Sequence, residues 1–368
     1  MEYRRHLKPI QYRKGCCIQT DNGSFIDFSS NDTLSLSTSS DLLDQFNGVS
    51  FDQFGSTGSR LLTGDSSYIQ RFETALALWL ARDRVLIFNS GFQLNSGLLS
   101  SILTKDDVIF MDKQCHASLI NGALASDAKL YRYRHHDLTH LETLLLQYRA
   151  QYQNAILVTE SLFSMDGTQS CLDQLVKLKH KFKTLLYVDD AHSMGLYGCE
   201  GRGLCLPYLP DIDYLVATFG KAFGSFGAFL ACDEPVYHTV INQCRSFIYT
   251  TALPRPVIYW NWLALDWIKL NNSERDNVIE LATYFRKNLA DLGVSFTGDG
   301  HIISVLIGND IETVSFSRVL QAHGFYALPI LPPTVPASAC CIRFSVTRAH
   351  TVTMIDDVLE CIRRYINA

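Results

Sequence analysis

Residues 185 to 192 read LLYVDDAH, a short apolar run that ends abruptly in two carboxylates and, two residues later, an imidazole. Four consecutive apolar residues are typical of a strand that is buried on both faces. In open α/β sheets, ligands bind at the edge where the parallel strands have their carboxyl ends. Asp189 and His192 are therefore candidate site residues, and the alternative is that Asp189 only caps a turn.

Similar apolar runs alternate with helix-like segments on both sides of this stretch. The runs are VLIF (85–88), VIFM (108–111), AILV (155–158) and YLVATF (214–219), and helical patterns occupy 93–103, 116–125 and 171–182. Strands that are apolar throughout and alternate with helices are typical of a parallel sheet covered on both faces. The pattern predicts one large α/β domain.

A second, smaller region follows this domain. A helical pattern over 276–293 ends at Gly293, as helices often do. Beyond it, strands near 302–307 and 341–346 and helices near 311–323 and from 351 predict an α+β unit. We expect an N-terminal segment (1–40), a large α/β domain (41–270) and a C-terminal α+β domain (271–368), with a site between the last two.

Composition and charge limit the classes of function. The chain has 368 residues and 47% apolar content, enough for a large core. Lys and Arg number 32 against 37 Asp and Glu, for a net charge of -5, so we expect no nucleic acid partner. No apolar run is long enough to span a membrane, and the N-terminal residues do not resemble a signal peptide. We expect a cytoplasmic protein without a membrane partner.

The eleven cysteines show no CxxC spacing. Their odd number and scatter favour reduced, mostly buried thiols over a disulfide framework or a zinc site. We expect no metal.

The stretch TFGKAFGSFGAF (218–229) places Lys221 among glycines and phenylalanines. A lysine after a strand is usually a solvated surface residue. Apolar surroundings, however, disfavour the ammonium, and a neutral amine is a nucleophile toward aldehydes. Pyridoxal 5'-phosphate is the cofactor that bonds to a lysine amine and also needs a carboxylate opposite its ring nitrogen, a role that suits Asp189.

Two further strand ends fit this cofactor. Ser90, Gly91 and Phe92 follow one apolar run and open a helix, whose N-terminal N–H groups favour a phosphate. His116 follows another run. Each signal alone is weak, because such glycines are common and an isolated histidine is more often structural. Their joint occurrence with Asp189 and Lys221 indicates a pyridoxal phosphate site.

Many phrases of the sequence resemble the α-oxoamine synthases, fold type I pyridoxal phosphate enzymes. They are FSSND (28–32), GSTGSRLLTG (55–64), FNSGF (88–92), HASL (116–119), VTESLFSMDG (158–167), VDDAHSMGLYGCEGRG (188–203), TFGKAFG (218–224), IYTTALP (248–254) and PPTVPA (332–337). These enzymes join an amino acid to an acyl thioester with loss of carbon dioxide. The resemblance implies a large, mostly parallel, seven-stranded sheet domain with helices on both faces, plus a smaller C-terminal α+β domain.

The resemblance also implies roles for residues at the cofactor. Lys221 is expected to form the aldimine and to move the Cα proton, Asp189 to face the pyridine nitrogen, and His116 to stack on the ring. His192 and Ser164 match positions near the phenolic oxygen. The remaining cofactor positions are Gly91 and Phe92 at the phosphate, Thr218 beside the cofactor, and Thr250 and Thr251, which match a segment that reaches the other subunit's cofactor and so imply a homodimer.

On the substrate side, the resemblance points to Arg5, Asn31, Thr334 and Arg343. Arg343 is the expected clamp for the amino acid carboxylate, which a planar guanidinium suits. The phrases HASL, SRLLTG and PPTVPA look most like the biotin-pathway branch of the family, which condenses L-alanine with pimeloyl-CoA or a pimeloyl carrier protein.

Some positions depart from the family pattern. Leu331 stands where an arginine commonly precedes PPTVP, and Thr33 and Ser35 replace a usual Tyr and Gly. These departures concern acyl specificity, so two alternatives stay open. One is a sister enzyme with another acyl donor or amino acid, such as an aminoketone-signal synthase, a glycine C-acetyltransferase or 5-aminolevulinate synthase. The other is a non-catalytic protein that keeps the fold for binding.

Overall fold

The computed structural model of the chain describes residues 7–366. Contacts within the chain divide it into two compact units. The large unit contains Asp41–Ser164 and Gln169–Asn272, and the small unit contains the segment up to Ser40, Met165–Thr168 and the chain from Ser273 onward. The N-terminal segment thus shares a unit with the C-terminal part of the chain.

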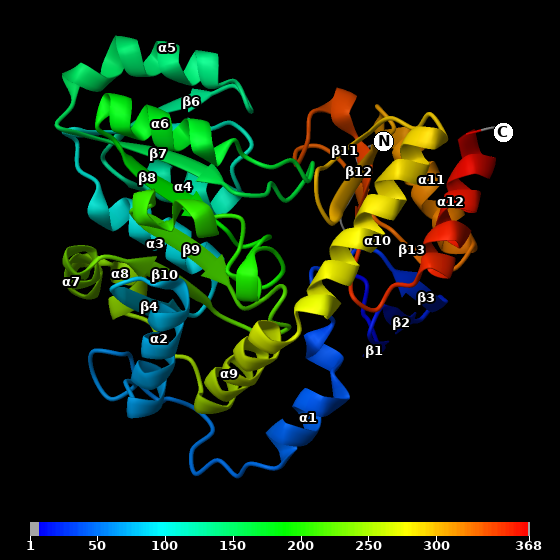
Figure 1. Cartoon of the computed structure of the whole chain (residues 1–368), viewed down its shortest axis with the longest axis horizontal. Coiled ribbons are helices and arrows are strands. Elements are labelled where there is room, and N and C mark those ends of the chain that lie inside the picture. Colours follow the sequence, from blue (N-terminus) through cyan, green and yellow to red (C-terminus); the bar gives the residue numbers. More distant parts are fainter. Residues whose placement is uncertain (1–6, 367–368) are drawn as a thin grey trace. The chain divides into compact units, whose positions relative to one another are not determined.

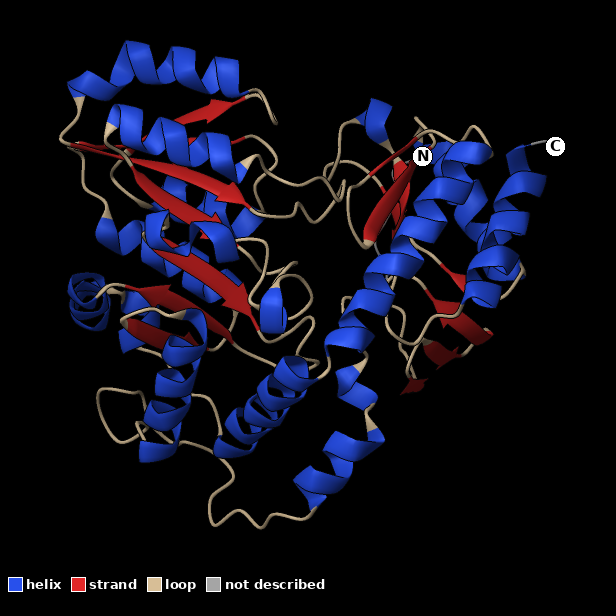
Figure 2. Ribbon diagram, in the orientation of Figure 1, coloured by secondary structure: helices blue, strands red, loops and turns tan. Residues whose placement is uncertain are grey.

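A seven-stranded sheet forms the centre of the large unit (Figures 1 and 2). Its strands, in spatial order, are β4 (Arg84–Phe88), β10 (Ala228–Cys232), β9 (Tyr214–Thr218), β8 (Leu185–Asp189), β7 (Asn154–Glu160), β5 (Asp107–Asp112) and β6 (Lys129–Tyr133). The pairs from β9 to β6 are all parallel, whereas β10 is antiparallel to both of its neighbours. Six of the seven strands therefore point the same way.

Helices cover both faces of this sheet. One apolar core joins alternate strand residues, such as Ile156 and Val158, to α3 (Gly91–Ile102), α4 (Ala117–Ala125), α7 (Glu234–Gln243) and α8 (Arg245–Ile248). The remaining helices of the unit include α1 (Ser40–Asn47), α2 (Ser67–Leu80), α5 (Leu138–Tyr148), α6 (Leu172–Phe182) and α9 (Arg255–Leu270). Because both faces are covered, the central strands are apolar at nearly every position.

Helices α3 and α4 approach each other closely at Gly122. A Cβ atom at this position would lie 2.4 Å from the Asn95 carbonyl oxygen and 3.1 Å from the Leu99 Cβ atom. The first distance is too short for a Cβ beside a backbone oxygen and the second is tight, so any side chain here requires α3 and α4 to shift. Across the same contact, Ser96 Oγ donates to the Ser118 carbonyl oxygen at 3.2 Å.

The small unit contains two further sheets. The strands β11 (Phe296–Thr297), β12 (Ile302–Leu306), β15 (Cys341–Ser345) and β14 (Pro329–Ile330) form an antiparallel sheet. The strands β1 (Tyr12–Lys14), β2 (Cys17–Thr20), β3 (Gly23–Asp27) and β13 (Phe325–Tyr326) form the second. Phe28 lies in one apolar core with residues of α10 (Asn272–Asp291), α11 (Asp310–Ala322) and α12 (Val352–Ile366).

The fold class predicted from the sequence is confirmed. The five predicted strands of the large sheet correspond to β4, β5, β7, β8 and β9, within two residues at each end. The apolar runs did not identify β6, a half-polar edge strand with the sequence KLYRY, or β10, which follows the glycine-rich stretch directly. No helix among residues 7–366 is both long and apolar enough to cross a membrane.

We expect Gly122→Ala to destabilise the large unit by about 1–3 kcal/mol, because the added methyl group forces α3 and α4 apart. Intrinsic helix propensity alone would predict that this change stabilises the unit by roughly 0.5–1 kcal/mol. The sign of the change in unfolding free energy therefore distinguishes the two effects. Urea unfolding followed by circular dichroism measures it. Asn121→Ala, at the neighbouring exposed position of α4, is the control; a Gly122→Ala protein as stable as this control would contradict the packing argument.

Candidate active site

Five strands of the large unit end at one edge of the sheet. Each ends in, or leads to, a titratable side chain or a glycine at the start of a helix. β4 leads to Gly91, β5 to His116 and β9 to Lys221, whereas β7 and β8 end in Glu160 and Asp189. Glu160 and Asp189 are direct partners in the parallel register. The structure therefore places the predicted Gly91, His116, Asp189 and Lys221 at a common edge.

Asp189 is a buried carboxylate with a donor on each oxygen. Its Oδ1 accepts the Ala191 backbone N–H at 3.0 Å, and its Oδ2 accepts Asn95 Nδ2 at 2.7 Å. An ionised carboxylate has about four acceptor sites. Asp189 can therefore accept a further hydrogen bond from a ligand.

His116 is the N-cap residue of α4. Its Nδ1 accepts the Ser118 backbone N–H at 3.2 Å and lies 2.8 Å from Ser118 Oγ. The ring of Phe92 meets it edge-on, with centroids 6.4 Å apart. Although the outer side of His116 is exposed, partial desolvation lowers its pKa, an effect that the Asp189 charge opposes and the Lys221 charge reinforces. Both charges thus lie close enough to act on the imidazole.

Glu160 is a buried acid that the sequence reasoning missed. Its Oε1 accepts the His116 backbone N–H at 2.5 Å, which ties the start of α4 to the end of β7. Burial, reinforced by the negative charge of Asp189, raises the pKa of Glu160 to about 8. A carboxylate at the end of an apolar strand is the same signal that identified Asp189, so the sequence did contain it.

Lys221 lies in the connection (219–227) between two antiparallel strands, β9 and β10. Phe219 N–H donates to the Gly227 carbonyl oxygen at 2.9 Å, and Thr218 Oγ1 donates to the same oxygen at 2.9 Å. The lysine is half-buried. Its aromatic neighbours differ from one another, because Phe219 and Phe223 are fully buried whereas Phe226 is 54% exposed. Two of the three phenylalanines near Lys221 in the sequence are thus buried, and the third is partly exposed in the single chain.

The N-terminus of α3 provides backbone donors beside these groups. Ser90 caps the helix by accepting the Gln93 N–H. The first N–H groups of a helix, here those of Gly91 and Phe92, have no intrahelical acceptor. Together with the helix dipole they favour a bound anion.

Thr250 and Thr251 are joined to the loop that carries GSTGSRLLTG. Thr251 forms an isolated bridge with Ser59, and Ala252 N–H donates to the Gly58 carbonyl oxygen at 3.0 Å. Asn89, at the end of β4, donates to the Thr251 carbonyl oxygen at 2.8 Å. Thr250 is half-buried and Thr251 exposed.

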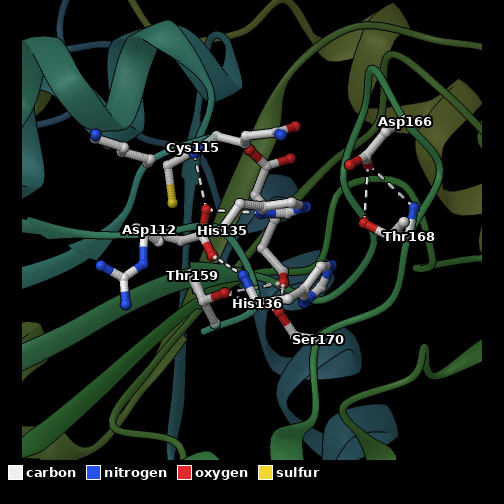
Figure 3. A network of polar contacts seen from close by, with 12 residues as sticks. Asp112, Cys115, His135, His136, Thr159, Asp166, Thr168 and Ser170 are labelled. Atoms are coloured by element: carbon white, nitrogen blue, oxygen red, sulfur yellow. Dashed lines mark hydrogen bonds and ion pairs between the residues drawn. The ribbon is translucent and has the colours of Figure 1, made fainter. Parts of the chain in front are cut away.

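The other two predicted cofactor residues also lie in the large unit. Ser164 is buried beyond β7, and His192 is half-buried beyond β8. Other polar contacts at the strand ends join Asp112 of β5 to His135 Nδ1 at 2.8 Å and Thr159 of β7 to Ser170 at 2.9 Å (Figure 3). This network fixes the loops that follow β5, β6 and β7.

Of the predicted substrate residues, Asn31, Thr334 and Arg343 lie in the small unit. Arg343, on β15, is buried and donates from Nη2 to Asn31 Oδ1 at 3.0 Å. Burial lowers the pKa of this guanidinium to about 10, so its charge is held at an energetic cost. Thr334 is exposed, and its N–H donates to the Leu331 carbonyl oxygen at 3.0 Å. Arg5 lies outside the described residues.

Three additional residues at the site were not predicted: Asn95, Ser118 and Tyr187. They are buried and hydrogen-bonded to one another or to Asp189 and His116. Asn95 belongs to the apolar stripe of α3 that includes Leu94, Leu98 and Leu99. A polar residue on such a stripe is a usable signal, because buried polar groups need partners.

Comparison with known proteins shows the family of the chain. The family model described as aminotransferase class I and II matches residues 24–362. A putative 8-amino-7-oxononanoate synthase of Glaesserella parasuis is 37% identical over 98% of this chain and 96% of its own length. An 8-amino-7-oxononanoate synthase of Chlorobaculum parvum is also 37% identical, over 96% of this chain and 92% of its own.

Two solved structures extend the comparison. The 8-amino-7-oxononanoate synthase of Francisella tularensis superposes with a TM-score of 0.79 and 29% identity, covering 93% of this chain and 98% of its own. A serine palmitoyltransferase of Sphingomonas wittichii superposes with a TM-score of 0.92, covering 97% of this chain and 91% of its own; at 24% identity it shows the fold alone. The chain belongs to the aminotransferase class I and II family, and within it to the α-oxoamine synthases, a family of pyridoxal phosphate-dependent enzymes of fold type I.

Proposed function

We propose that the protein condenses L-alanine with a pimeloyl thioester to give 8-amino-7-oxononanoate, carbon dioxide and free coenzyme A or carrier protein, a step of biotin biosynthesis. The observation that carries the proposal is the meeting of Asp189, His116 and Lys221 at one sheet edge, where the charges of the first and last act on the imidazole. The named relatives at 37% identity support the substrates.

The residues at this edge fit pyridoxal 5'-phosphate group by group. Lys221 carries an amine that can bond to the aldehyde, and Asp189 retains acceptor capacity for a ring N–H. Gly91 and Phe92 offer helix N-terminal amides to the phosphate. A Cβ at Gly91 would lie 3.9 Å from Thr218 Cβ, so the glycine leaves this corner open.

When bound, the cofactor would supply an electron-withdrawing ring that stabilises negative charge at the amino acid Cα. Asp189 would hold the proton on the ring nitrogen, because a buried carboxylate stabilises a neighbouring cationic N–H. His116 would cover one face of the ring and exclude water there. Lys221, once released by the amino acid, would take the Cα proton on Nζ and later return one, which is general acid and base work.

Arg343 would hold the substrate carboxylate. A planar guanidinium can make two parallel hydrogen bonds to a carboxylate, and Asn31 already orients one of its nitrogen atoms. The desolvation that lowers the pKa of Arg343 also strengthens its attraction to an incoming anion. The same residue would keep the carboxylate in place until carbon dioxide leaves.

The choice of acyl group is supported by the relatives more than by the chain's own residues. Leu331, where the family commonly has an arginine, is buried and apolar. One charged contact that the family pattern leads us to expect for the acyl substrate is therefore absent. This observation favours, as the second candidate, a sister α-oxoamine synthase that uses a different acyl thioester or amino acid.

We also propose a homodimer. Large apolar side chains are exposed around the loop that packs on Thr250 and Thr251: Phe54 is 84% exposed, Leu62 80% and Tyr249 74%. Exposed apolar residues gathered on neighbouring loops mark an association surface more often than scattered single ones do. A second copy of the chain would cover them.

We expect purified protein given pyridoxal phosphate to show the visible absorption of a lysine-bound cofactor, and Lys221→Ala to lack it. The substitution removes the amine that forms the bond, so turnover should also fall by several orders of magnitude. Absorption spectroscopy after gel filtration is the measurement. Lys177→Ala, at an exposed helical position, is the control; a Lys221→Ala protein with the same band as this control would rule out the assignment.

Turnover should be fastest with L-alanine and a pimeloyl thioester. The assay follows carbon dioxide and free thiol with alanine, glycine or serine against pimeloyl, acetyl and longer acyl thioesters, each as coenzyme A and carrier-protein forms. Preference for another pair would replace the first proposal with the sister-enzyme alternative. Absence of turnover with every pair, together with absence of the cofactor band, would leave a non-catalytic binding protein.

Arg343→Lys should raise the KM for the amino acid about tenfold or more and change the KM for the thioester less. Lysine keeps the positive charge but loses the planar pair of donors. Steady-state kinetics with each substrate varied in turn separates the two effects. Arg318→Lys, at an exposed position of α11, is the control, and equal changes in both KM values would speak against a carboxylate clamp.

Light scattering should give about twice the 41.5 kDa mass of one chain. Leu62→Glu should shift the protein toward the monomer, because a charge would have to be buried at the contact. A monomeric parent protein at micromolar concentration would contradict the proposed dimer.

A further inference from the structure

A buried chain of hydrogen bonds connects the two groups proposed to face the cofactor from different sides. Tyr187 Oη lies 2.6 Å from Asn95 Oδ1, and Asn95 Nδ2 lies 2.7 Å from Asp189 Oδ2 and 2.9 Å from Ser118 Oγ. Ser118 Oγ lies 2.8 Å from His116 Nδ1. Asn95, Ser118 and Tyr187 are each at most 1% exposed, so these bonds form away from water.

The orientation of the Asn95 amide follows from its neighbours. In the orientation given, its two N–H groups face Asp189 and Ser118, and its oxygen accepts the Tyr187 hydroxyl. Turned over, the amide would place its oxygen against the Asp189 carboxylate and leave only the Tyr187 oxygen for its two hydrogens. Because a carboxylate is an acceptor, the first orientation is strongly favoured.

The orientation of the Asn95 amide also determines which group donates in the hydrogen bonds between Ser118 and His116. Since Ser118 Oγ accepts a hydrogen from Asn95, its own hydrogen is available for His116 Nδ1. The Ser118 backbone N–H, which can only donate, points at the same nitrogen at 3.2 Å. His116 Nδ1 is therefore an acceptor, and the ring proton must be on Nε2.

We infer that Asn95 is a positioning residue that fixes the Asp189 carboxylate and, through Ser118, holds the His116 ring as the tautomer with its proton on Nε2. The hydrogen-bond part of this inference concerns the chain alone; its consequence for catalysis rests on the proposed function. A single amide would thereby set the carboxylate opposite the ring nitrogen and the imidazole against the ring face.

The same arrangement disfavours the imidazolium form of His116. Protonation of Nδ1 would set its N–H against the Ser118 backbone N–H, which can only donate, and would require the Ser118 hydroxyl to turn from donor to acceptor. This agrees with the lowered pKa of His116, whose main cause is desolvation. The charged groups around the ring are Asp189 on β8 and Lys221 after β9, while Glu160 on β7 holds the backbone N–H of His116.

The test measures protonation of His116 directly by nitrogen-15 NMR of histidine-labelled full chain, with and without added pyridoxal phosphate. The resonances are assigned with a His116→Gln variant. At neutral pH we expect an unprotonated Nδ1 and a protonated Nε2. A proton on Nδ1 would overturn the inference.

Three variants separate the two effects of Asn95. Asn95→Leu should raise the His116 pKa by about one unit, because hydrogen bonds that favour the neutral ring are weakened. It should also shift the pH titration of the cofactor band, because Asp189 loses the hydrogen bond from Asn95. Ser118→Ala should raise the His116 pKa without the second effect. Ser96→Ala removes a different bond between α3 and α4 and should change neither.

The inference fails if Asn95→Leu and Ser118→Ala both match Ser96→Ala in the His116 titration. Circular dichroism checks that each variant is folded; if Asn95→Leu is not, Ser118→Ala alone decides the tautomer argument, because it removes only one hydroxyl. Absence of a cofactor band from the parent protein would instead defeat the proposed function, while the tautomer measured in the chain without cofactor would still decide the hydrogen-bond inference.

Discussion

The common direction of six strands is the constraint on which the site depends. Each strand of the parallel set ends at the same edge, so residues more than a hundred positions apart in sequence are delivered to one place. The antiparallel strand β10 adds a second constraint. Because it returns directly beside β9, the loop that carries Lys221 is tied at both ends through the Gly227 carbonyl oxygen. A lysine in an ordinary crossover connection would have no such tether.

Strands that are apolar along their whole length could be predicted from the sequence. Prediction failed for a strand with polar residues and for a strand that follows glycines. Runs such as LLYV are apolar because both faces of the sheet are covered, so their ends could be located and the polar residues after them recognised. β6 was not predicted because it is a half-buried edge strand that carries Lys129 and Arg132. β10 was not predicted because glycines precede it in the sequence and indicate a loop, although its own residues AFLAC are fully buried.

The hydrogen bonds that orient the site were less accessible to sequence reasoning. Asn95 stands out only as a polar residue on an apolar helix stripe, and its partner Ser118 is an ordinary serine in the first turn of α4. Their contact depends on the close approach of α3 and α4, which Gly122 permits. Periodicity predicts that a helix exists and which face it buries. It does not predict how near two helices come, and that distance decides whether the Asn95 amide can bridge the end of β8 and the first turn of α4.

The proposed cofactor residues and the proposed substrate residues belong to different units of the chain. The carboxylate, imidazole and amine proposed to act on the cofactor belong to the large unit, where buried bonds to Asn95 and Glu160 restrict change. Arg343, Asn31 and Leu331 belong to the small unit, on separate elements with their own core. Under the proposed function, a leucine in place of arginine before PPTVP would alter contacts with an acyl group while the hydrogen bonds of Asp189 and His116 stay as they are. If the proposed roles hold, departures from the family pattern in the small unit would bear on which substrates are joined, and departures in the large unit would bear on whether the reaction occurs.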